Sequence, residues 1–199
     1  MADYKELVFA TSNNNKIIEI NRLLPKNLLI SLKMLHDMGI EEELPETRST
    51  IEGNAIQKAQ YIYDNYGYNC FAEDTGLVVK SLNGEPGIYS ARYAGEDRDD
   101  DKNMNKVLEK LKTKSNRRAH FKTVIALIID GILHTFEGKI EGEISLSKRG
   151  DSGFGYDPIF RPNGYDQTFA EIGINEKNKI SHRAKALNKL ITFLKNYYI

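Results

Sequence analysis

The chain has 199 residues, 40% of them hydrophobic, and its 28 Lys and Arg balance its 28 Asp and Glu. This length suits one α/β domain, which we expect to span residues 1–199, and the even charge balance argues against a broad nucleic-acid surface. The one cysteine, Cys70, excludes an intramolecular disulfide and is expected to be a buried strand thiol. The N-terminus lacks the long apolar core of a signal peptide, and the longest strongly apolar run, residues 124–129, is too short to span a bilayer. We therefore expect a cytoplasmic protein without a membrane partner.

The first third of the chain predicts a strand, a polar turn and two helices. Residues 6–10 read as the strand, and apolar residues between 17 and 24 recur at helical spacing until Pro25. A second helix is predicted to start near Ser49, because Ser49 to Glu52 has the spacing of a capping box, and to end near Gly67.

Two adjacent acids, Glu73 and Asp74, lie between short predicted strands at 71–72 and 77–79, and a turn-prone Thr75-Gly76 follows them. Neighbouring carboxylates repel each other and are costly to desolvate, so such a pair persists inside a fold mainly where a cation or hydrogen-bond donors offset that cost. The pair points to a magnesium-dependent site. Two solvated acids at a strand end explain the same residues equally well.

Further along, a third helix is predicted beyond the acidic run 99–101, with its apolar face between Met104 and Leu111. Residues 121–129 form a nearly continuous apolar run, and Asp130-Gly131 predicts a hairpin turn into a second strand. A last helix is predicted to open at Ser181. These elements together imply a mixed sheet.

The turn between the first strand and the first helix contains Thr11, Ser12, Asn13, Asn14, Asn15 and Lys16. Backbone N–H groups, the helix dipole and the Lys16 ammonium could converge there on one phosphate. The turn contains no glycine and fits neither the Walker A nor the Rossmann pattern. A generic phosphate site and plain helix capping both remain open.

Two later segments suit recognition of a flat base. Residues 153–158 place Phe154 and Asp157 among glycines, so Phe154 could stack on a base and Asp157 could accept a hydrogen bond from it. His182 and Arg183 stand at a helix start, an unfavourable place for positive charge, which suggests a negative or carbonyl-like partner. A tight hairpin with core aromatics, and ordinary surface basicity, are the respective alternatives.

Taken together, these segments resemble the inosine triphosphate pyrophosphatase family, house-cleaning enzymes that remove deaminated purine nucleoside triphosphates. The matching motifs occur in the family's order over almost the whole chain: residues 11–16, Glu46-Thr47, Asn54-Ala55 with Lys58, residues 74–77, 86–93, 154–160 and 181–183. The resemblance implies an α/β fold with a long twisted mixed β-sheet and flanking helices, two lobes with a central nucleotide cleft, and usually a homodimer. Glu73 and Thr75 depart from the family, in which Asp and Ser often stand at these places.

The resemblance also implies residue roles. Asp74 would accept a proton and bind Mg²⁺ together with Glu46 and Glu73, and Lys16 would join it in catalysis. The implied substrate-binding residues are Thr11, Ser12, Asn13, Asn14, Asn15, Lys16, Lys58, Thr75, Phe154, Gly155, Tyr156, Asp157, Lys177, His182 and Arg183. Phe154 would stack on the base, while Asp157, Lys177, His182 and Arg183 would hold or read its edge.

The implied reaction is hydrolysis of ITP, dITP or XTP to the monophosphate and pyrophosphate, with water attacking the α-phosphorus. Two other functions fit the same residues. One is a house-cleaning pyrophosphatase for modified pyrimidine or methylated nucleotides, and the other is a purine nucleotide-binding protein without catalysis. Pyrophosphate release from a panel of nucleotides distinguishes the three.

Overall fold

The computed structural model describes residues 5–25 and 28–197. Its six strands form one sheet in the order β2-β1-β3-β4-β5-β6. The strands are β1 (Lys5–Phe9), β2 (Ile30–Met34), β3 (Cys70–Val79), β4 (Arg118–Ile129), β5 (Ile132–Ile144) and β6 (Phe160–Pro162). β1 pairs in parallel with β2 and β3, whereas β5 and β6 are antiparallel, so the predicted mixed sheet is confirmed.

Five α-helices accompany the sheet in the described residues: α1 (Asn14–Leu23), α2 (Ile51–Tyr66), α3 (Asp100–Lys110), α4 (Phe169–Ile180) and α5 (His182–Tyr197). The chain divides into two compact units. The first comprises Met1–Asp74, Val124–Glu137 and Ala186–Ile199, and the second comprises Thr75–Thr123 and Gly138–Lys185. Strands β3, β4 and β5 and helix α5 each contribute residues to both units.

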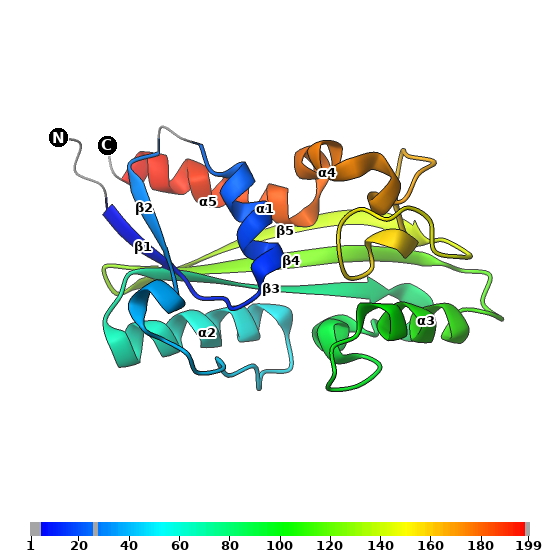
Figure 1. The fold of residues 1–199 in the computed structure, drawn as a ribbon, viewed down its shortest axis with the longest axis horizontal. Coiled ribbons are helices and arrows are strands. Elements are labelled where there is room, and N and C mark those ends of the chain that lie inside the picture. Colours follow the sequence, from blue (N-terminus) through cyan, green and yellow to red (C-terminus); the bar gives the residue numbers. More distant parts are fainter. Residues whose placement is uncertain (1–4, 26–27, 198–199) are drawn as a thin grey trace. The chain divides into compact units, whose positions relative to one another are not determined.

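In the first unit, the two faces of the sheet are covered by different helices. Phe9 and Phe71 stack with ring centroids 4.5 Å apart and share an apolar cluster with residues of α1 and α5, which lie together in Figure 1. Cys70 precedes Phe71 on β3 and therefore points to the opposite face. Its Sγ lies 3.2 Å from the carbonyl oxygen of Ala59 in α2. Burial raises the pKa of this thiol to about 12, as a structural cysteine requires.

The core of the second unit is built from residues of β3, β4, β5, β6, α3 and the start of α4. Phe121 lies with its ring centroid 4.7 Å from that of Phe160 and 6.1 Å from that of Phe169. Met104 and Val107 of α3 belong to the same apolar cluster, which confirms the predicted inward face of that helix. Asp99 caps α3 by accepting a hydrogen bond from Lys102 N.

The predicted second helix is confirmed: it spans Ile51–Tyr66, with Thr50 rather than Ser49 as its N-cap, and Thr50 Oγ1 accepts from Gly53 N at 2.9 Å. One local prediction was wrong. The Thr75-Gly76 pair forms no turn: β3 continues through both residues to Val79. β1 pairs with β3 only at Cys70 and Phe71, and β4 is the neighbour of β3 on its other side in the sheet.

Other predicted features are confirmed. Asp130 and Gly131 adopt φ values of 50° and 79°, the positive values of a type I′ hairpin turn. α5 follows Ser181, whose Oγ accepts from Ala184 N, and Leu187, Leu190 and Leu194 are buried. No helix in residues 5–25 and 28–197 has the length and apolar character needed to cross a membrane.

Candidate functional site

The predicted acids of the first unit come from β3 and from the segment that precedes α2. Asp74 is 8% exposed and Lys58 of α2 is 6% exposed. Lys58 Nζ lies 2.6 Å from Glu46 Oε1 and 3.5 Å from Asp74 Oδ1, so one ammonium contacts both carboxylates. Asn54, also on α2, donates from Nδ2 to Asp74 Oδ2 at 3.5 Å.

Burial and charge oppose each other at Asp74. Burial raises the pKa of the Asp74 carboxyl above its usual value, although Lys58 and Lys16 act to lower it. Burial disfavours the charged form of Lys58, but Asp74 and Glu46 outweigh this effect and raise the pKa of the ammonium. The lysine therefore stays protonated at neutral pH, and the carboxylate is a stronger base than an exposed aspartate.

Glu73 faces away from this group. Successive side chains of a strand point to opposite faces of the sheet, so the Glu73 side chain points to the face covered by α1. There, Lys16 Nζ lies 3.1 Å from Glu73 Oε1. The Glu73 side chain is fully buried and that of Lys16 is 15% exposed. Both acids are thus buried against lysines, and the alternative of two solvated acids at a strand end is wrong.

The polar turn between β1 and α1 caps the helix. Asn13 Oδ1 accepts a hydrogen bond from Lys16 N at 3.2 Å, and Thr11 Oγ1 accepts one from Asn13 N at 3.2 Å. Residues 12–15 are exposed, so their remaining backbone and side-chain donors face solvent. Helix capping is observed, and binding of a phosphate at the same helix start stays a prediction.

The donor set suits a magnesium ion that is shared with a substrate. In residues 5–25 and 28–197, no group of three or more His, Cys, Asp and Glu side chains could hold a metal. Glu46 and Asp74 nevertheless surround a cation already, the Lys58 ammonium. Magnesium commonly takes one or two protein carboxylates and completes its shell with water and substrate phosphates. Two carboxylates that already accommodate positive charge fit that requirement.

In the second unit, cations gather around Phe154. Lys177 Nζ lies 5.0 Å and Arg183 Cζ lies 5.5 Å from the centroid of the Phe154 ring. Asp157 Oδ2 accepts from Lys177 Nζ at 2.6 Å and from Phe154 N at 3.0 Å. Gly153 has a φ of 84°, and a Cβ there would lie 2.0 Å from Asp157 Oδ2, so only glycine fits. The segment is a tight loop that holds a half-buried Phe154 against charged residues.

His182 and Arg183 are 3% and 2% exposed, so ordinary surface basicity does not account for them. The His182 ring stacks on Phe121 with centroids 4.5 Å apart. Arg183 Nη2 lies 3.5 Å from Thr75 Oγ1, which connects the start of α5 to β3 within this unit. Tyr156 is buried and its hydroxyl donates to the carbonyl oxygen of Ser90, so it holds the loop in place.

Sequence reasoning assigned no role to three residues of these clusters. Asn54 contacts Asp74, and its Oδ1 also accepts from Arg48 N at 2.8 Å. Thr123, on β4, lies with its hydroxyl 2.5 Å from that of Thr75. Ser90 Oγ accepts from Leu77 N at 2.9 Å. Asn54 and Ser90 belong to matched motifs, whereas no sequence signal marks Thr123.

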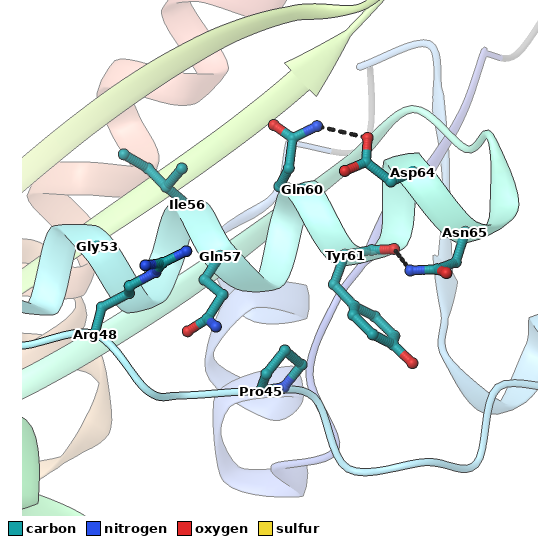
Figure 2. Close-up of a pocket in the computed structure, with 9 residues that line it drawn as sticks. All are labelled: Pro45, Arg48, Gly53, Ile56, Gln57, Gln60, Tyr61, Asp64 and Asn65. Atoms are coloured by element: carbon teal, nitrogen blue, oxygen red, sulfur yellow. Dashed lines mark hydrogen bonds between the residues drawn. The ribbon is translucent and has the colours of Figure 1, made fainter.

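A cavity of about 440 Å³ opens between α2 and the segment that precedes it (Figure 2). Its lining consists of Pro45, Arg48, Gly53, Ile56, Gln57, Gln60, Tyr61, Asp64 and Asn65, none of which is a predicted site residue. Several of these polar groups are already paired: Gln57 Oε1 accepts from Thr47 N, and Gln60 donates to Asp64. The Gln57 contact fixes the segment that carries Glu46.

An open mixed sheet with helices on its faces makes this an α/β protein; the cluster of the first unit suits phosphates, and that of the second unit suits a flat ring. The chain belongs to the Ham1 family, whose model matches residues 7–193. This result confirms the resemblance stated from the sequence.

Curated relatives match over nearly their whole length. A dITP/XTP pyrophosphatase of Flavobacterium psychrophilum is 56% identical over 191 residues, which cover 96% of this chain and 100% of the relative. One of Bacillus subtilis is 45% identical over 194 residues, with coverages of 96% and 97%. Among solved structures, a Ham1 protein of Coxiella burnetii has a TM-score of 0.90 at 39% identity, covering 96% of this chain and 99% of its own. The Ham1 protein of Staphylococcus aureus has a TM-score of 0.88 at 40% identity, covering 97% and 100%.

Proposed function

We propose that this chain hydrolyses dITP, ITP and XTP to the nucleoside monophosphate and pyrophosphate. The observation that carries the proposal is the contact of two carboxylates, the partly exposed Glu46 and the buried Asp74, with the buried Lys58 ammonium. It is found in a chain of the Ham1 family whose curated relatives are named dITP/XTP pyrophosphatases. Those names favour purine substrates over modified pyrimidines, and catalysis over binding alone.

The chemistry of the first unit follows from its charges. Water attacks the α-phosphorus, the bond to the bridging oxygen of the pyrophosphate breaks, and Asp74 takes the proton of the water. The burial that raises the pKa of Asp74 makes its carboxylate a better proton acceptor than an exposed aspartate. Lys16 and Lys58 offset negative charge on the triphosphate and on the departing pyrophosphate. Thr11 and the exposed donors of residues 12–15 would bind the remaining phosphate oxygens.

Glu46 and Asp74 would hold magnesium beside the substrate. When bound, magnesium supplies further neutralisation of the phosphate oxygens and activation of water. The 3.1 Å contact of Glu73 with Lys16 supports a different role for Glu73, which is to fix the Lys16 ammonium. Direct metal binding by Glu73 stays a prediction.

The second unit would recognise the base. Phe154 offers a ring face for stacking, and Gly155 and Tyr156 hold the loop that carries it. Lys177, His182 and Arg183 are donors that could reach a 6-oxo group, with Asp157 orienting Lys177 through the 2.6 Å ion pair. Adenine presents a 6-amino group, so donors would face donors, and such a mismatch strongly disfavours binding.

Pyrophosphate release tests the proposal. ITP, XTP, GTP, ATP and a modified pyrimidine triphosphate are compared at equal concentration, each with magnesium and with EDTA. We expect fast, magnesium-dependent release from ITP and XTP alone. Release from the pyrimidine instead would identify the rival enzyme, and nucleotide binding without release from any substrate would identify a binding protein.

Asp74→Asn provides the matching variant test. It should reduce the rate below one tenth of wild type while the far-ultraviolet circular dichroism stays unchanged. Asp64→Asn is the control, because Asp64 is exposed on α2 and contacts Gln60 rather than the acid pair. A rate for Asp74→Asn above one tenth of wild type would exclude Asp74 as the essential proton acceptor.

We also propose a cytoplasmic homodimer. The nucleotide pool as substrate supports this location, and the family resemblance supports the dimer. Light scattering of the purified protein gives its mass directly, and a mass of one chain would remove the dimer from the proposal.

A further inference from the structure

The hydroxyls of Thr75 and Thr123 lie close together, and Thr75 directly follows Asp74 in the sequence. Thr75 follows Asp74 on β3, and Thr123 lies on the neighbouring strand β4. Their Oγ1 atoms are 2.5 Å apart, a short hydrogen bond in which the geometry allows either oxygen to donate. Thr123 is fully buried at 0% exposure, whereas Thr75 is partly exposed. The two hydroxyls therefore differ in which other partners they can reach.

The count of protons decides which hydroxyl donates. Each hydroxyl carries one proton and two acceptor positions, and an arginine can only donate. Arg183 Nη2, 3.5 Å from Thr75 Oγ1, therefore fills one acceptor position of Thr75. Within the described part of the chain, the Thr123 hydroxyl forms its hydrogen bond with Thr75. If Thr75 donated, the buried proton of Thr123 would lack an acceptor, which is the costly arrangement.

We infer that Thr123 is a positioning residue: it donates to Thr75 Oγ1 and, together with Arg183, fills both acceptor positions of that oxygen. The single proton of Thr75 is then left for a phosphate oxygen of the substrate. This inference rests on the proposed function, in which Thr75 contacts the substrate. With the bond reversed, Thr75 would present its remaining lone pair to an anion, which is repulsive.

The side chains also restrict the geometry. Threonine is branched at Cβ, so its χ1 angle has few accessible values, and the hydrogen bond selects one of them for Thr75. Valine has nearly the shape of threonine without the hydroxyl, and serine keeps the hydroxyl without the methyl group. Substitution of Thr123 by each of these residues separates the hydrogen bond from packing.

The kinetic test compares Thr123→Val, Thr123→Ser, Thr75→Val and the double variant Thr75→Val/Thr123→Val. kcat and KM are measured for pyrophosphate release from ITP with magnesium. Thr123→Val should lower kcat/KM by about tenfold, the effect of losing one hydrogen bond to a charged group. Thr123→Ser should recover most of that loss. In the Thr75→Val background, Thr123→Val should change kcat/KM by less than about twofold, because it acts through Thr75.

Thr192→Val is the matched control, since the exposed Thr192 hydroxyl donates to Asn188 O within α5 and lies outside both clusters. It should leave kcat/KM unchanged. Two results would overturn the inference and assign Thr123 to packing. One is a double variant whose loss of kcat/KM equals the product of the two single-variant losses, and the other is a Thr123→Ser variant as impaired as Thr123→Val.

Two measurements need no turnover and so separate this inference from the proposed function. By proton NMR, the Thr123 hydroxyl proton should exchange slowly with water in the wild type and rapidly in Thr75→Val. By calorimetry, inorganic tripolyphosphate should bind Thr123→Val about tenfold more weakly than wild type. A wild type that binds tripolyphosphate but cleaves no nucleotide would refute the function alone. Fast hydroxyl exchange, or equal tripolyphosphate affinities, would refute the role of Thr123.

Discussion

Replacement of Lys58 by methionine tests whether the acid cluster depends on one internal cation. Lys58 Nζ contacts Glu46 at 2.6 Å and Asp74 at 3.5 Å, and the Lys58 side chain is 7% exposed. Methionine fills similar volume without the charge. Two carboxylates would then lie near each other without the ammonium between them, and Asp74 would remain largely buried.

The expected loss of stability follows from these distances. At an effective dielectric constant of about 20, a charge pair 3.5 Å apart is worth about 5 kcal/mol before desolvation is subtracted. Glu46 is 32% exposed at its side chain, so its share is smaller. Removal of one partner of a buried pair typically costs about 3 to 5 kcal/mol. The raised pKa of Asp74 lets it take up a proton in the variant, so we expect a loss near the lower end, about 3 kcal/mol.

Urea unfolding in EDTA measures this loss. At a typical slope of about 2 kcal/mol per molar urea, the midpoint of Lys58→Met should fall by about 1.5 M. The double variant Lys58→Met/Asp74→Asn should regain about 1 to 2 kcal/mol, because Asn needs no counter-charge. Lys112→Met, which removes an exposed lysine, should leave the midpoint unchanged. A midpoint for Lys58→Met close to wild type, or strictly additive losses in the double variant, would refute the reasoning.

Three more predictions concern other parts of the chain. Gly53→Ala should destabilise the protein by about 1 kcal/mol, although helix propensity alone favours alanine, because the new Cβ would lie 2.9 Å from both Arg48 Cβ and the capping Thr50 Oγ1; a higher urea midpoint would contradict this. Phe154→Ala should raise the KM for ITP by about tenfold, since stacking on a base is worth roughly 1 to 3 kcal/mol; an unchanged KM would remove Phe154 from the site. Burial raises the pKa of Cys70 to about 12, so iodoacetamide at pH 8.5 should modify the thiol in urea and not in the native protein. Modification of the native protein would show that burial does not raise the pKa of this thiol. Because the pKa of Cys70 is higher in the folded state than in the unfolded state, its contribution to the free energy of unfolding should fall as the pH rises from about 9 to 12.

Periodicity and turn chemistry predicted the elements whose signals are local. α3 and α5 bury the apolar faces that their spacing indicated, and Asp130-Gly131 makes the expected hairpin turn. α4 was missed, although Thr168 and Glu171 have capping-box spacing and Glu171 accepts from Thr168 N. The helix is interrupted at Gly173, which has a φ of 75°. The interruption divides α4 into two short segments, and neither is long enough to show a clear 3.6-residue apolar periodicity.

Short strands were harder to predict, because their structure depends on partners elsewhere in the chain. β2 and β6 have five and three residues and are defined by pairing with β1 and β5. The continuation of β3 through Thr75-Gly76 likewise depends on a partner distant in sequence, because β4 is the neighbouring strand there and β1 pairs with β3 only at Cys70 and Phe71. A dipeptide that is turn-prone in isolation can adopt the extended form where a neighbouring strand of the sheet pairs with it.

For the adjacent acids, the sequence indicated which residues matter but not how they are arranged in space. The sequence indicates that Glu73 and Asp74 need positive partners, and each has one: Lys16 for Glu73 and Lys58 for Asp74. Strand alternation then assigns the two acids to opposite faces, α1 for one and α2 for the other. Glu46 approaches Asp74 from the α2 side through its contact with Lys58. The pair that geometry favours for magnesium is therefore distant in sequence, and only the fold brings it together.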